Sequence, residues 1–424
     1  MDLIEKQNKK GDKKIIPARR FPDFANDGEW EEAAFENTFL FLPNNTLSRA
    51  ELNYENGSTK NLHYGDVLIK FGDCLDVQTN VLPFISDEAI ADRLQRSRLQ
   101  DGDVIIADTA EDETVGKCTE IFNVSGENVV SGLHTIPIRP KKQFAIPYLG
   151  FYFNSDSYRK QLLPLMQGVK VMSISKAAIG KTIVAYPSLL TEQCIIGSCL
   201  SSMDAYISAT KEKLELLKTY KKGLMQKLFP AKGKKLPELR FKEFEKDGEW
   251  EVKKLEEIVN VLDSQRKPVA KNERVRGQYP YYGANGIQDY VSDYIFDGSF
   301  ILMGEDGSVI NKDGTPVIHW AEGQIWVNNH AHVMSENRNA AYLKYVFYVL
   351  SNVEVQSLVK GIPPKINQQN MRNILLLIPS LLEQEKIASC LSTLDEKINA
   401  YKEKVTLLGQ YKKGLMQQLF PTSK

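Results

Sequence analysis

The sequence has no excess of basic residues. It contains 54 Lys and Arg against 54 Asp and Glu, so its formal net charge is +0. A protein that binds DNA alone usually has a basic excess, because neutralising phosphates supplies much of the affinity. The balance therefore counts against a solitary DNA-binding protein. It is compatible with a chain whose basic residues are clustered or whose partners contribute positive charge.

The sequence also lacks paired cysteines and long apolar runs. Its five cysteines form no C-x-x-C pair, which is typical of reduced thiols in the cytosol. No apolar run approaches the ~20 residues that span a bilayer. The first six residues, MDLIEK, are polar and charged, unlike a signal peptide. We therefore expect a cytoplasmic protein that has no contact with a membrane.

Motifs of DNA-modifying enzymes are missing as well. An adenine methyltransferase carries Asn or Asp before Pro-Pro-Tyr/Phe, whereas residues 362–365, IPPK, have only the prolines. Residues 175–182, SKAAIGKT, approach a phosphate-binding loop but lack its first glycine and precede an expected strand. His330 and His332 alternate along a strand, but no third ligand has suitable spacing for a metal. We expect no catalytic residue, metal site or cofactor.

An internal repeat organises the chain. Residues 220–230 read YKKGLMQKLFP and residues 411–421 read YKKGLMQQLFP, with only Lys227 replaced by Gln418. A second block, DGEWE, occurs at 27–31 and again at 247–251. The bodies between these blocks differ in length and barely resemble each other. One scaffold that carries two different modules explains this pattern; duplication followed by ordinary drift is the alternative.

The repeated segments are predicted to be long helices, each of about 40 residues or ~60 Å. Their apolar residues recur at steps of three and four, which is typical of a narrow coiled-coil seam. The seam residues are Leu200, Met203, Ile207, Leu214 and Leu217 in the first copy and Leu391, Leu394, Ile398, Val405 and Leu408 in the second. Ser380 and Glu383 are expected to form a capping box. The simplest arrangement is an antiparallel pair; packing of each helix on its own domain is the alternative.

The two bodies combine short strands with turns. In the first, strands are expected at 65–70, 102–107 and 182–186, each beside a turn signal or the helix start. In the second, strands lie around the turn YGANG, and an amphipathic helix is expected at 341–350. The predicted fold class is α+β, with a curled mixed sheet in each body. The expected boundaries are 1–186 and 231–378 for the bodies and 187–230 and 379–424 for the long helices.

The phrases YPYYGANGI, ILMGEDGS, WVNNHAHV and KKGLMQ-x-LFP resemble the DNA specificity subunit of type I restriction-modification systems, and the resemblance covers about residues 17–421. It implies two globular target recognition domains, each reading one half of a split sequence in double-stranded DNA. It implies that the helices, related by a pseudo-two-fold repeat, fix the spacing and dock two methyltransferase (M) subunits. Restriction (R) subunits complete the complex, and S-adenosylmethionine, ATP and Mg belong to the partners. The first body has no obvious equivalent of YGANG.

Candidate DNA-contacting residues follow from the need for side chains that reach base edges and phosphates. In the second body they are Tyr282, Gly283, Asn285, Gly286, Asn328, Asn329, His330, Lys360, Lys365, Asn367 and Gln368. In the first body they are Arg96, Arg98, Lys170, Ser173 and Lys176. Each residue alone could equally be an ordinary solvated side chain. A stand-alone DNA-modifying enzyme and a coiled-coil protein adaptor remain the alternative functions.

Overall fold

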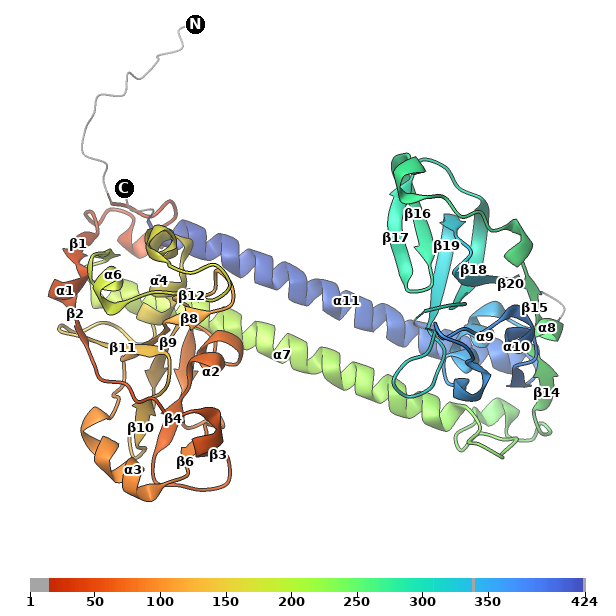
Figure 1. Ribbon diagram of the computed structural model, residues 1–424, viewed down its shortest axis with the longest axis horizontal. Helices are drawn as coiled ribbons and strands as arrows, with labels where there is room; N and C mark the ends of the chain where they lie inside the picture. The colour runs from red at the N-terminus through yellow and green to blue at the C-terminus, as the bar shows by residue number, and fades with distance from the viewer. Residues whose placement is uncertain (1–14, 308, 338–339, 422–424) are drawn as a thin grey trace, which may run out of the picture. The chain divides into compact units, whose positions relative to one another are not determined.

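The computed structural model describes residues 15–307, 309–337 and 340–421 (Figure 1). The polar run at residues 1–6 and the last three residues of the predicted 379–424 segment lie outside these ranges. The chain divides into two compact units: unit 1 combines Met1–Thr210 with Lys404–Lys424, and unit 2 is Lys211–Glu403. In the described part of the chain, no helix has both the length and the apolar character that crossing a bilayer requires.

Two helices of 39 residues dominate the chain, as predicted: α7 (Leu190–Leu228) and α11 (Leu381–Leu419). Each unit contains the first half of one helix and the second half of the other. The halves run antiparallel, because Lys412 binds Asp204 in unit 1 and Lys221 binds Asp395 in unit 2. The two ion pairs occupy equivalent positions of the repeat, so the same cross-helix contact fixes the register in both units.

The seam between the helices is narrow. Of its predicted residues, Leu214 is buried in the seam, whereas Leu200 and Leu391 are buried in the cores of units 1 and 2. The others are half-buried: Met203, Ile207, Leu217, Leu394, Ile398, Val405 and Leu408. Towards the helix ends the packing changes, because Ile196 and Phe420 lie in the core of unit 1. The alternative of core packing therefore holds at the ends, and the coiled-coil pattern holds along the middle.

The capping box at the start of α11 is only half formed. The Glu383 backbone N–H donates to the Ser380 hydroxyl at 3.4 Å. The Glu383 carboxylate, expected to return to the backbone, instead accepts two hydrogen bonds from Arg240 at 2.8 and 2.7 Å. Arg240 also donates to the Asp247 carbonyl, at 2.7 Å. Charge-assisted bidentate pairing is the stronger interaction, and it explains why the capping prediction was wrong in this part.

Unit 1 repeats this clamp. Arg20 donates to both oxygens of Glu192 at 2.7 and 2.6 Å, and to the Asp27 carbonyl at 2.8 Å. The backbone matches too: Arg19 N–H donates to the Gln418 carbonyl, and Leu239 N–H donates to the Lys227 carbonyl, both at 2.9 Å. In each unit, the segment just before the DGEWE block thus contacts the start of one long helix and the end of the other.

Unit 1 carries two larger mixed sheets. The five-stranded sheet has the order β2 (Phe39–Phe41), β11 (Thr135–Pro140), β7 (Val104–Ala107), β9 (Cys118–Phe122), β5 (Cys74–Asp76). The four-stranded sheet has the order β10 (Val129–Ser131), β4 (Lys60–Leu62), β6 (Phe84–Ile85), β3 (Leu52–Asn53). Two-stranded pairs join β1 (Glu31–Ala34) to β13 (Ile183–Tyr186), and β8 (Thr109–Ala110) to β12 (Met172–Ser173). The short helices are α1 (Phe35–Thr38), α2 (Tyr64–Ile69), α3 (Glu88–Arg93), α4 (Leu149–Asn154), α5 (Asp156–Leu162) and α6 (Lys176–Gly180).

The expected strand at 65–70 is wrong, because this segment is helix α2. The His63 ring accepts a hydrogen bond from Gly65 N–H and caps the helix. Asp66 is buried and pairs with Lys70 four residues later, which stabilises a helix but not a strand. Ile69 is 84% exposed, so the apolar run does not face a core along its length. The strands expected at 102–107 and 182–186 are present as β7 and β13.

Unit 2 is built on one six-stranded mixed sheet. Its order is β15 (Val259–Val261), β20 (Ala331–Glu336), β18 (Phe296–Gly304), β19 (Ile318–Val327), β16 (Arg276–Gly283), β17 (Gly286–Val291). A separate pair joins β14 (Glu251–Lys254) to β21 (Leu375–Ile378). The short helices are α8 (Leu255–Ile258), α9 (Leu343–Leu350) and α10 (Gln368–Arg372). Helix α9, expected to be amphipathic, buries six of its eight residues in the unit 2 core.

Candidate nucleic-acid interface

The YGANG turn joins β16 to β17. Gly283 pairs with Gly286 across it, and Asn285 is exposed at its tip. Gly286 has a φ of +96°, a region that favours glycine over residues with a side chain. The selection of Tyr282 as a DNA contact was wrong, because its side chain is only 9% exposed and lies in the apolar core of the sheet. Of the side chains in this turn, Asn285 is therefore the one positioned to reach a ligand.

A second turn connects β19 to β20. Asn328 is 3% exposed, and its side-chain oxygen accepts a hydrogen bond from His330 N–H at 2.8 Å. It shapes the turn and does not face outward, which corrects its selection as a base contact. Asn329 and His330 are exposed. The His330 ring nitrogen Nδ1 lies 2.7 Å from Asp306 Oδ1, so the ring is held at the surface in one orientation.

The third group lies on the chain that leads into α10. Lys360 and Lys365 are exposed, and Lys365 pairs with Glu305 at 2.9 Å. Asn367 accepts from Asn370 N–H at 2.8 Å and caps α10. Gln368 donates to Asp263 at 2.8 Å. Lys360 therefore remains available to phosphates, whereas Lys365, Asn367 and Gln368 are engaged in holding the segment in place.

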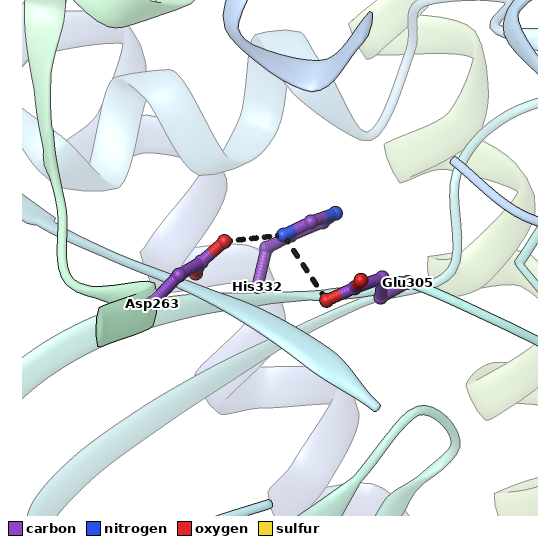
Figure 2. A group of neighbouring side chains, drawn as sticks. All are labelled: Asp263, Glu305 and His332. Carbon is purple, nitrogen blue, oxygen red and sulfur yellow. Dashed lines mark hydrogen bonds and ion pairs between the residues drawn. The ribbon is translucent and has the colours of Figure 1, made fainter. Parts of the chain in front are cut away.

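A buried cluster of charged side chains contacts the chain that leads into α10. Figure 2 shows Asp263, Glu305 and His332 converging, and His332 is 0% exposed. Its Nδ1 lies 2.6 Å from Asp263 Oδ2 and 3.7 Å from Glu305 Oε2. Its Nε2 lies 2.8 Å from the Ile366 carbonyl oxygen. Both ring nitrogens of His332 therefore have an oxygen partner within the fold, which fixes the orientation of the buried ring.

This cluster fits an ion-pair network better than a metal site. Arg266 binds Glu305 at 2.6 Å, and Lys365 binds its other oxygen. Burial acts to raise the pKa of Asp263, but the hydrogen bond and charge of His332 outweigh it and hold the pKa below its ordinary value. For Glu305, hydrogen bonds from Lys365 and Arg266 likewise outweigh burial and lower the pKa. Protein cations already occupy the positions that a metal would need.

The cluster also changes the interpretation of the two histidines. His330 and His332 were considered as a pair on one strand, but they have different acidic partners: Asp306 for the first, and Asp263 and Glu305 for the second. The acids come from the segment after β15 and from the end of β18, far apart in sequence from β20. Spacing along one strand could not reveal these partners, because they depend on sheet order.

The candidates in unit 1 fall into two groups. Arg96 lies in the 3-10 turn Leu94–Ser97, and Arg98 forms a bridge with Val130 beside the four-stranded sheet. Lys170 and Ser173 lie on the segment that contains β12, and Lys176 opens α6 with its Nζ 3.2 Å from the Leu42 carbonyl. All five are exposed. Figure 1 shows β10 and α3 in a different part of unit 1 from β8 and β12, so the two groups lie on separate elements.

One residue was missed. His134 precedes β11 as His330 precedes β20, and each of these strands pairs with its sheet's buried central strand. Asp108 N–H donates to the His134 carbonyl at 3.1 Å, and Glu305 N–H donates to the His330 carbonyl at 2.9 Å. His134 Nδ1 also lies 3.2 Å from an Asp108 oxygen. The flanking sequences, SGLHTIPI and VNNHAHVM, share only the histidine before an apolar strand.

Comparison with known proteins gives a consistent result. Residues 247–407 match the family model of the type I restriction modification DNA specificity domain. A Haemophilus influenzae protein assigned as a type I restriction enzyme specificity subunit is 37% identical over 148 residues, which cover 35% of this chain and 38% of that protein's length. The assigned MjaX specificity subunit of Methanocaldococcus jannaschii is 24% identical over 77% of this chain and 79% of its own.

A solved structure shares the fold. The type I restriction-modification S subunit from M. genitalium superposes with a TM-score of 0.61 at 14% sequence identity. The match covers 96% of this chain and 100% of that one. At this identity the likeness concerns the fold alone: two α+β bodies on a repeated pair of long helices.

Proposed function

We propose that this chain is the DNA-recognition subunit of a type I restriction-modification complex, because residues 247–407 match the family model of the DNA specificity domain and 77% of the chain is similar to the MjaX specificity subunit. Each unit reads one half of a bipartite site in double-stranded DNA. The observation that carries this proposal is the duplicated clamp, Arg20–Glu192 and Arg240–Glu383, which holds two unlike sheet-bearing bodies on one repeated frame. A repeated frame with different bodies suits recognition of two different sequences.

The same proposal gives the long helices two roles. They set the distance between the half-sites, since 39 residues of helix measure about 58 Å. They also dock two methyltransferase subunits, which are joined by restriction subunits. S-adenosylmethionine, ATP and Mg bind to those partner subunits, and this chain is non-catalytic. The balanced charge of the chain fits a subunit whose partners contribute part of the attraction to phosphates.

The proposal is tested by footprinting the full chain, with and without its methyltransferase partner, on DNA that carries the site found by mapping host methylation. Two protected half-sites separated by an unprotected gap are expected. The chain alone, incubated with DNA, metal and S-adenosylmethionine, should yield no methylated or cleaved product. One continuous footprint, or product formed by the chain alone, contradicts the proposal.

The spacing role has its own test. Inserting seven residues into α7 after Thr210 and seven into α11 after Glu403 preserves the seam and lengthens each helix by about 10 Å. At ~3.4 Å per base pair, the preferred gap should grow by about three base pairs. A control with five residues inserted in each helix, which rotates the following part of the seam by about 140°, should unfold or lose binding. An unchanged preferred gap with the seven-residue insertion would show that the helices are not the spacer.

A further inference from the structure

Two hairpins occupy equivalent positions in the unlike bodies. In unit 1, Gln167 and Ser173 exchange two backbone hydrogen bonds, of 2.9 and 2.8 Å. In unit 2, Lys360 and Lys365 exchange the same pair of bonds, again of 2.9 and 2.8 Å. We name these the tip hairpins, residues 167–173 and 360–365. Each closes a loop of only a few residues, so both loops are held tightly at their base.

The tip hairpins are attached in the same way. Ile174, just after the first, donates from its backbone N–H to the Asp108 carbonyl at 2.9 Å. Ile366, just after the second, donates to the Glu305 carbonyl at 2.9 Å. Both isoleucines are buried, at 3% and 0% exposed. Asp108 and Glu305 also donate backbone hydrogen bonds to the carbonyls of His134 and His330. Each hairpin therefore lies close to one of these histidines.

Both loops present a fully exposed aliphatic side chain directly after a glycine, and in the first loop Val171 is also 54% exposed. Val169 is 99% exposed and Ile362 is 102% exposed. The preceding glycines, Gly168 and Gly361, have φ of +117° and +85°, which favour glycine at these turns. A single exposed aliphatic residue is ordinary on a protein surface. An exposed aliphatic residue at the same place in two otherwise unlike bodies is not explained by chance exposure.

Lysine side chains lie beside both tips, and in unit 2 Lys365 is paired with Glu305. Lys170 follows Val169 directly, and Lys360 and Lys365 flank Ile362 at the base of the second loop. Phosphates attract such side chains, whereas an apolar protein partner would gain nothing from them. Apolar side chains that enter DNA between base steps, flanked by cations on the backbone, are a general way to grip and bend a duplex.

Resting on the proposed function, we propose that Val169 and Ile362 are matching wedges. Each tip enters a base step of its own half-site from the minor groove, while Lys170 and Lys360 bind the flanking phosphates. The hairpins thus perform the same task in both units, and the sequence-reading side chains differ around them. In unit 2, the pairing of Lys365 with Glu305 and the bond from His332 to the Ile366 carbonyl position the hairpin rigidly.

The test uses the full chain with a duplex that carries the mapped site, in which 2-aminopurine replaces one adenine at a time. Unstacking of a base raises 2-aminopurine fluorescence, so wild-type binding should brighten one step in each half-site. Ile362→Ser should abolish the signal in one half-site, and Val169→Ser in the other, with roughly tenfold weaker binding for each. Val81→Ser and Val252→Ser, at exposed aliphatic positions of units 1 and 2 outside the hairpins, are the matched controls.

The outcomes separate this inference from the proposed function. If the wild-type chain binds both half-sites but no step brightens, or if the tip variants brighten and bind as the wild type does, the wedges are refuted and the specificity role stands. If the tip variants keep DNA binding but lose the methyltransferase partner, the tips contact protein and the inference is wrong. If the wild-type chain does not recognise a bipartite site, both proposals fail. Thermal unfolding should be unchanged in both tip variants, since both side chains are fully exposed.

Discussion

Replacing Arg20 by methionine is expected to destabilise unit 1 by about 3–5 kcal/mol, the usual cost of breaking a buried ion pair from one side. Arg20 and Glu192 have side chains that are 9% and 1% exposed. Without Arg20, the carboxylate keeps one neutral donor, the Trp30 ring N–H at 3.3 Å. A buried charge with so little compensation costs far more than an exposed one.

A double-mutant cycle isolates the pair. In the combined Arg20→Met and Glu192→Met variant no buried charge is left alone, so the loss should be smaller than the sum of the single losses by about 2 kcal/mol or more. It should not return to zero, because Arg20 also donates to the Asp27 and Gly28 carbonyls. Each of those hydrogen bonds contributes about 1 kcal/mol.

Urea unfolding gives the total change, and hydrogen exchange with mass spectrometry assigns it to a unit. Peptides from 15–34 should lose protection in Arg20→Met, while peptides from 235–254 keep theirs. Arg240→Met should give the reverse pattern with a similar loss, because its partner Glu383 is also 1% exposed. Additive losses in the cycle, or loss of protection spread equally over both units, would refute this account of the clamp.

Three further outcomes are expected. Burial raises the pKa of Glu120 to about 7, so the folded state binds a proton that the unfolded state has released. This contribution to stability is present below pH ~4.5 and is lost by about pH 7, a change of roughly 3 kcal/mol. Glu120→Gln should abolish that slope in pH-dependent unfolding. Lys412→Met should cost more than the equivalent Lys221→Met, because Lys412 contacts two carboxylates and Lys221 one; denaturant midpoints measure this. Asn285→Ala should change or abolish sequence preference in binding assays on cognate and altered half-sites, while the melting temperature stays the same.

The long helices could be predicted because their pattern is local. Apolar residues at steps of three and four specify a seam over 39 residues, whatever the bodies look like. The short segment at 65–70 could not be predicted in the same way. Its helix depends on the His63 cap and on the contacts of Asp66 with Lys70 and Arg49, which a short apolar run does not indicate.

The candidate interface was predictable in part, because turn signals are also local in the sequence. Turn signals placed Asn285, Asn329 and His330 at exposed positions, as the structure has them. Burial of Tyr282 and Asn328 depends on which strands lie next to each other, and sequence alone does not give strand order. The sequence around His134 barely resembles that around His330, and the two tip hairpins barely resemble each other. Only their matching backbone hydrogen bonds show that they are equivalent.

The backbone hydrogen bond beside the clamp of unit 1 joins Arg19 to Gln418, which are far apart in sequence, whereas the equivalent bond in unit 2 joins Leu239 to Lys227, which are close in sequence. During synthesis, unit 2 can therefore assemble as soon as residue 403 has left the ribosome. Unit 1 is translated first but must wait for Leu419 and Phe420, which complete its core. The apolar surface of unit 1 then stays exposed until these two residues have been made, so a chain truncated before Leu419 would carry one finished module and one that is prone to aggregation.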